Sequence, residues 1–287
     1  MDSLRRFVFS NHDIRGEFVS LEQSFTQLIE GKGYPSTVCN LLGEFLTASV
    51  LLSTTLKFKG RLVLQARSAG SVPLIMAECN NKQEVRGIAR FDTEVSSSSF
   101  SSMVGNGTLA ITIEPEQGEP YQGIVPLEGR NLAECLESYF SQSEQLKSRF
   151  YLHVEKFRCV GLMLQQLPRQ IEKDLDSYLE AWSTVSQLAS TVTRQELISL
   201  DLDVLLKRLF NQFSIRLFDS ESVQFNCSCS RERTAKALNL LGAKEIMSVL
   251  REQGKVEVTC EFCGTSYVYV ESELKLLFES AVDNQVH

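Results

Sequence analysis

Residues 227–270, CSCSRERTAKALNLLGAKEIMSVLREQGKVEVTCEFCGTSYVYV, decide how the end of this chain folds. Four of the chain's eight cysteines lie in this stretch as two close pairs, Cys227 with Cys229 and Cys260 with Cys263. Two close cysteine pairs separated by about thirty residues are typical of a closed tetrahedral site for Zn²⁺. Because four thiolates leave no open coordination position, we expect one zinc ion with a structural role.

The residues around the cysteines predict a small α+β module over 227–287. Two short helices are expected at 231–241 and 243–253, with a break at Gly242. The runs 255–259 and 266–270 predict a β-hairpin whose turn carries Cys260 to Gly264. Such a turn presents two sulfurs to one ion, which supports the zinc interpretation.

Three other kinds of site use similar cysteines. A zinc ribbon that binds nucleic acid needs a basic surface, whereas residues 227–287 carry seven Lys/Arg and nine Asp/Glu, a net charge of −2. The Cys-x-Cys spacing of the first pair is unlike the usual iron–sulfur runs. A dithiol oxidoreductase remains the alternative, resting on Cys260-x-x-Cys263, although thioredoxin-like pairs open a helix rather than a hairpin turn.

The whole chain has the composition of an ordinary globular protein. Its 287 residues are 43% hydrophobic and 23% charged, with a net charge of −7 that disfavours nucleic acid as a partner. No apolar run is long enough to span a membrane, and residues 1–6 lack the apolar stretch of a secretory signal. We therefore expect a cytoplasmic protein without a membrane partner, in which clustered cysteines bind metal or carry out redox chemistry.

The fold class predicted from the pattern is α+β, in three parts. Residues 1–170 mix short strands with helices, including a long apolar helix that opens at Ser36, without regular βαβ alternation. A serine-rich stretch, 96–102, is expected to be a surface loop. Residues 171–226, here called the linker segment, predict two amphipathic helices between 171 and 210 with a break at 191–193. The zinc-binding module, 227–287, forms the third part.

The remaining cysteines and the histidines show no catalytic pattern. Cys39, Cys79, Cys135 and Cys159 fall on apolar faces or strands, where a cysteine is a small buried hydrophobe. None of the three histidines has a motif partner, and the chain has no protease, hydrolase or kinase signature. No enzymatic activity is expected.

Taken together, these features resemble the heat-shock protein 33 family of bacterial holdase chaperones over nearly the whole length. The stretches that carry the resemblance are DIRG (13–16), YP (34–35), LLGE (41–44), LKF (56–58), RGIAR (86–90), GTLAIT (107–112), YQGIVPL (121–127), SEQ (143–145), QQLP (165–168), CSCS (227–230) with Glu232-Arg233, and VTCEFC (258–263).

The resemblance implies an ATP-independent, redox-regulated chaperone that protects against oxidative stress. In the reduced, inactive state zinc would be bound by Cys227, Cys229, Cys260 and Cys263. Oxidants would form the disulfides Cys227–Cys229 and Cys260–Cys263 and expel the metal, and the linker segment would unfold. The protein, as a homodimer, would then hold unfolding client proteins until cellular thiol reductants reverse the change.

The chemistry of the site supports that sequence of events. Zinc-bound sulfurs are thiolates, the species that oxidants attack, and a sulfenic acid formed on one meets a neighbour two or three positions away. Structural zinc contributes roughly 10–16 kcal/mol, more than a 61-residue module's expected stability. We therefore expect the module to melt on oxidation, so that the helices of the linker segment lose a packing partner. The candidate client-binding residues, packed as core until then, are Leu179, Trp182, Leu205 and Phe210.

Overall fold

The computed structural model describes residues 2–54, 59–92, 95 and 99–283, and for 279–283 the backbone alone. The stretch 56–58 and residues 96–98 of the serine-rich patch lie outside the described residues. The chain divides into two compact units, Met1–Asn226 and Cys227–His287. Each unit mixes helices and strands, which confirms the α+β class; a separate linker segment remains a prediction.

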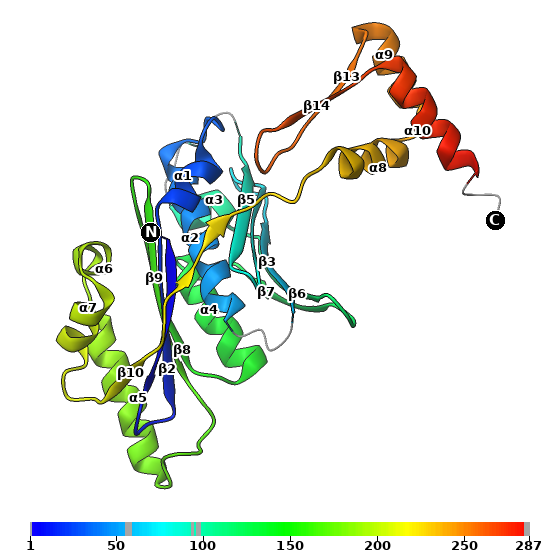
Figure 1. Cartoon of the computed structure of the whole chain (residues 1–287). Helices are drawn as coiled ribbons and strands as arrows, with labels where there is room; N and C mark the ends of the chain where they lie inside the picture. Colours follow the sequence, from blue (N-terminus) through cyan, green and yellow to red (C-terminus); the bar gives the residue numbers. More distant parts are fainter. Residues whose placement is uncertain (1, 55–58, 93–94, 96–98, 284–287) are drawn as a thin grey trace. The chain divides into compact units, whose positions relative to one another are not determined.

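The first unit is built on two β-sheets (Figure 1). Sheet A has the order β10-β1-β2-β9-β8, with β11 paired to β1, and sheet B has the order β12-β5-β4-β3-β6-β7. Neighbours are antiparallel except β12 and β5. Sheet A consists of β1 (Ser3–Phe9), β2 (Ile14–Leu21), β8 (Ser148–Glu155), β9 (Arg158–Gln166), β10 (Ile215–Leu217) and β11 (Glu221–Ser222). Sheet B consists of β3 (Gly60–Arg67), β4 (Leu74–Asn80), β5 (Glu84–Arg90), β6 (Thr108–Pro115), β7 (Tyr121–Pro126) and β12 (Gln224–Phe225).

The long apolar helix is the core of this unit. Helix α2 (Ser36–Ser53) contacts strands of both sheets, and it lies between them in Figure 1. Its length and composition would also suit a membrane span, but 72% of that window is buried inside the protein. Three further elements complete the core: α1 (Gln23–Ile29), α4 (Leu132–Tyr139) and the π-helical turn η1 (Phe140–Glu144).

The serine-rich patch is partly helical, contrary to the predicted loop. Ser99 accepts a hydrogen bond from the Ser102 backbone N–H and caps α3 (Phe100–Val104). Phe100 and Met103 are buried in the core, and this burial holds the short helix in place.

Both faces of sheet A are buried. Successive side chains of a strand point to opposite faces of the sheet, and apolar residues of sheet A lie on both. On β2, Val19 faces the α2 core, while its neighbour Phe18 faces a second apolar cluster. That second cluster is covered by α5 (Leu175–Ser190), α6 (Arg194–Ser199) and α7 (Leu202–Leu209). The sequence predicted two helices here, and three are found because the backbone is extended at Leu200 and Asp201. The linker helices are therefore docked on sheet A.

The second unit is a small module with its own core. It contains α8 (Arg231–Leu241), α9 (Ala243–Gln253), the hairpin β13 (Val256–Thr259) and β14 (Ser266–Tyr269), and α10 (Glu271–Asp283). The two central helices and the hairpin match the prediction, whereas α10 was missed. Among the side chains that the structure describes, six are buried in its core: Leu238, Ile246, Leu250, Val256, Tyr269 and Leu274. Modules of about sixty residues bury a smaller fraction of their surface than larger domains do, and they often need a metal or another source of stability.

Candidate metal centre

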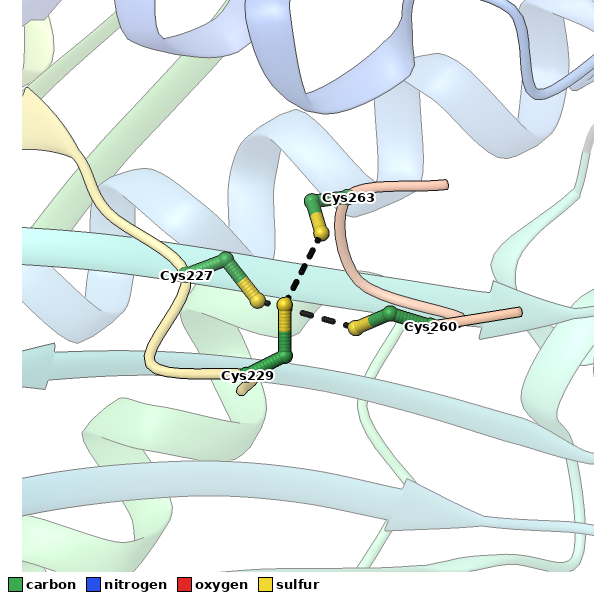
Figure 2. A group of neighbouring side chains, drawn as sticks. All are labelled: Cys227, Cys229, Cys260 and Cys263. Atoms are coloured by element: carbon green, nitrogen blue, oxygen red, sulfur yellow. Dashed lines mark hydrogen bonds between the residues drawn. The ribbon is translucent and has the colours of Figure 1, made fainter. Parts of the chain in front are cut away.

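The four C-terminal cysteines form one cluster (Figure 2). Their Sγ atoms all lie within 4.8 Å of one another. The Sγ atoms of Cys227 and Cys260 are 3.6 Å apart, and those of Cys229 and Cys263 are 3.3 Å apart. Four zinc–sulfur bonds of ~2.3 Å in a tetrahedron place the sulfurs roughly 3.8 Å from one another. The donor set and its spacing therefore fit one zinc ion.

The hairpin fixes the second pair of sulfurs. The backbone N–H of Cys260 donates to the Thr265 carbonyl at 2.9 Å, and the N–H of Gly264 donates to the Cys260 carbonyl at 2.8 Å. Gly264 has a φ of +73°, which a residue without Cβ adopts at little cost. This tight turn brings Cys260 and Cys263 to the same side of the hairpin end (Figure 2).

The start of α8 fixes the first pair. Ser230 caps the helix by accepting a hydrogen bond from the Arg233 backbone N–H. The Arg233 guanidinium reaches back and donates to the Ser228 carbonyl at 2.9 Å and to its hydroxyl at 2.6 Å. Ser228 lies between Cys227 and Cys229, so Arg233 holds the Cys-x-Cys segment against the helix.

Two hydroxyl groups contact sulfurs of the cluster, and neither contact was predicted from the sequence. The Tyr267 hydroxyl donates to Cys229 Sγ at 3.2 Å, and Thr265 Oγ1 lies 3.2 Å from Cys263 Sγ. Only Tyr267 lies in a strand, β14, whereas Thr265 belongs to the turn, so no simple periodicity in the sequence pointed to both hydroxyl groups. Donors of this kind orient metal-bound thiolates and tune their reactivity.

The thiols of the cluster differ in their pKa values. Burial, together with the neighbouring thiols, raises the pKa of Cys227 to about 12, and burial raises that of Cys229. Burial acts in the same direction on Cys263, but hydrogen bonds with Thr265 and the neighbouring cysteines outweigh it and bring its pKa to about 6. One sulfur of the cluster is thus readily ionised, and a divalent cation would favour ionisation of the others.

The other four cysteines belong to the first unit. Cys79, Cys135 and Cys159 are buried, and Cys39 is half-buried. Burial raises the pKa of each of these thiols. The three buried cysteines are the small buried hydrophobes that the sequence predicted, whereas Cys39 is more exposed than expected.

The candidate client-binding residues differ in exposure. Trp182, Leu205 and Phe210 are buried, whereas Leu179 is 40% exposed, so the prediction that all four pack as core is wrong for Leu179. The buried three pack with residues of sheet A, including an edge-to-face contact between Phe9 and Phe210 at 5.2 Å. Sheet A already buries these faces, so melting of the cysteine module would not uncover them by removing their packing partner. The helices must also leave the sheet.

Comparison with known proteins identifies relatives along the whole chain. The family model described as "Hsp33 protein" matches residues 2–270. The 33 kDa chaperonin of Ectopseudomonas mendocina is 46% identical over 283 residues, which cover 98% of this chain and 96% of that protein. The 33 kDa chaperonin of Pseudomonas fluorescens is 42% identical over 98% of this chain and 94% of its own length. The crystal structure of the Thermotoga maritima 33 kDa chaperonin has the same fold, with a TM-score of 0.84 at 23% identity, covering 98% of this chain and 99% of that one.

Proposed function

The chain belongs to the Hsp33 protein family, and on that premise we propose that it is a redox-regulated, ATP-independent holdase chaperone rather than an enzyme. The observation that supports the redox part is the ring of four sulfurs from two distant segments. In the reduced state Cys227, Cys229, Cys260 and Cys263 would hold one Zn²⁺ and the chaperone would be inactive. When bound, the ion would keep all four sulfurs as thiolates and tie the ends of the module together.

Activation would be a two-electron oxidation of each near pair. A thiolate sulfur attacks one oxygen of peroxide, the O–O bond breaks, and a sulfenic acid and hydroxide are formed. The second thiolate of the pair attacks that sulfur, the S–S bond forms, and a second hydroxide leaves. The proposed products are the disulfides Cys227–Cys229 and Cys260–Cys263, which no longer supply thiolate ligands, so the metal is released.

Loss of the metal would unfold the module. Zinc binding contributes roughly 10–16 kcal/mol in such sites, while the described side chains of this module form a small apolar core around Leu250. Each short disulfide closes a loop of a few residues and restrains the unfolded chain little. The linker helices would then leave sheet A and expose Trp182, Leu205 and Phe210, together with the already exposed Leu179, to unfolding client proteins. Dimerisation, a cytoplasmic location and reversal by thiol reductants belong to the same proposal.

Light scattering from a heat-unfolded client tests the function. Peroxide-treated protein should suppress aggregation without ATP at a near-stoichiometric ratio, and reduced, zinc-loaded protein should not. Equal suppression by the two forms would reject the switch.

A dithiol oxidoreductase is the second candidate, favoured by the Cys263 pKa of about 6. An oxidoreductase would reduce insulin disulfides catalytically, whereas a holdase acts stoichiometrically and would not.

A further inference from the structure

A buried carboxylate fastens the start of the linker segment to the first unit. Asp13 lies just before β2 and is 4% exposed. Its two oxygens accept hydrogen bonds from the backbone N–H groups of residues 170, 171 and 172 at 3.0–3.1 Å. Its own carbonyl accepts the N–H of Leu167 at 2.7 Å. Asp13 therefore binds the turn between β9 and the linker segment at both ends, at Leu167 and at residues 170–172.

Further hydrogen bonds connect this turn to α5. The Tyr178 hydroxyl, in the first turns of α5, donates to the Leu167 carbonyl at 2.8 Å, and Gln166 Nε2 donates to the Tyr178 carbonyl at 3.3 Å. Asp174 caps α5 by accepting the Ser177 N–H. The direction in which α5 runs across sheet A is thus set by residues 166–178, and Asp13 is the anchor of that segment on β2.

The chemistry explains why an acid occupies this position. Three consecutive backbone N–H groups point at one carboxylate, and bonds of this charge-assisted kind are about twice as strong as neutral ones. The amide of Asn could accept only through one oxygen, and its NH₂ group would face backbone donors. Ile171, whose backbone N–H donates to Asp13, is itself 52% exposed and is therefore not held mainly by burial.

We propose that Asp13 is a latch that keeps the linker helices α5–α7 docked on sheet A in the resting protein. The consequence for activation rests on the proposed function: loosening the latch lowers the oxidant exposure at which the helices are released. The latch itself is a property of the first unit and is measurable without a client.

The test compares Asp13→Asn with Asp2→Asn in reduced, zinc-loaded, full-length protein. Asp2 makes a matched set of bonds, because its buried carboxylate accepts the N–H groups of residues 22, 23 and 24, but it holds α1 instead of the linker. Trp182 is the only tryptophan of the chain, lies on α5 and is buried, so its fluorescence reports docking directly.

For Asp13→Asn we expect a red-shifted Trp182 emission and proteolytic cleavage within 169–192 that is roughly tenfold faster or more, with zinc content unchanged. Asp2→Asn should leave both readouts of the linker near wild type. Equal cleavage rates and emission in the two variants would overturn the latch. Undocking in Asp13→Asn without any gain in client holding would keep the latch and count against the proposed function.

Discussion

Cys229 and Cys263 are 34 residues apart in sequence, yet their Sγ atoms lie 3.3 Å from each other. The second short sulfur contact, between Cys227 and Cys260, also crosses from one pair to the other. Each disulfide across the pairs would close a loop of more than thirty residues and contribute roughly 3–4 kcal/mol, which would offset part of the stability lost with the metal. Disulfides within each pair close loops of a few residues and offset much less, so the proposed unfolding is expected with that pairing.

Peptide mapping under non-reducing conditions decides between the two pairings. After peroxide treatment we expect peptides linked as Cys227–Cys229 and Cys260–Cys263, together with loss of the far-UV signal of the module. Recovery of Cys229–Cys263 as the main product would contradict the release mechanism.

Substitution of a single ligand should abolish the metal site. Cys263→Ser leaves three thiolates and a hydroxyl that zinc binds poorly, so we expect purified protein with less than one tenth of the wild-type zinc. Cys39→Ser is the control, since Cys39 lies outside the cluster, and should retain full zinc. Undiminished zinc in Cys263→Ser would show that the ligand set is wrong.

The hydroxyl of Tyr267 should protect the sulfur of Cys229 from oxidation. A hydrogen bond to a thiolate lowers its electron density, so Tyr267→Phe should lose zinc to peroxide about two- to fivefold faster. Tyr269→Phe removes a hydroxyl from the same strand that bonds the Arg231 carbonyl and touches no sulfur of the cluster. Stopped-flow zinc release compares the two variants. A Tyr267→Phe rate equal to that of Tyr269→Phe would mean that the hydrogen bond has no protective effect.

We expect Glu17 to make the stability of the first unit depend on pH. Its side chain is buried, one carboxyl oxygen has no hydrogen-bond partner, and burial raises the pKa to about 7 against the lowering effects of Arg15 and Arg6. The folded state thus binds this proton more tightly than the unfolded state. Stability from this group is complete below about pH 4.5 and is lost as the pH rises to 7.

We therefore expect Glu17→Gln to stabilise the first unit by about 1–3 kcal/mol at pH 8 and by little at pH 5. Urea unfolding followed by Trp182 fluorescence at the two pH values measures this difference. A variant that is less stable than wild type at pH 8 would show that the carboxylate is favourable as an ion.

The periodicity of apolar residues and the spacing of cysteines were sufficient to predict the central features of the fold and the site. The alternation of apolar residues located the main strands, the apolar stripe located α2, and the cysteine spacing located the cluster of four sulfurs. These signals are local, because a strand, a helix face or a ligand pair each lies within a few residues.

What the sequence did not show depends on contacts between distant segments. The short strands β10, β11 and β12 have too few residues for a pattern and exist because they pair with β1 and β5. The bond between Asp13 and residues 170–172 joins segments about 157 residues apart. Docking of the linker helices on sheet A was missed for the same reason, since an amphipathic stripe shows that a face is buried and not what buries it.

Zinc content is the most direct measure of the proposed switch. Protein purified anaerobically should contain one zinc ion per chain, and titration with peroxide should release that ion as the four cluster thiols disappear, with client holding rising in parallel. Protein that contains no zinc but is equally folded and equally inactive, or that holds clients while zinc stays bound, would contradict it.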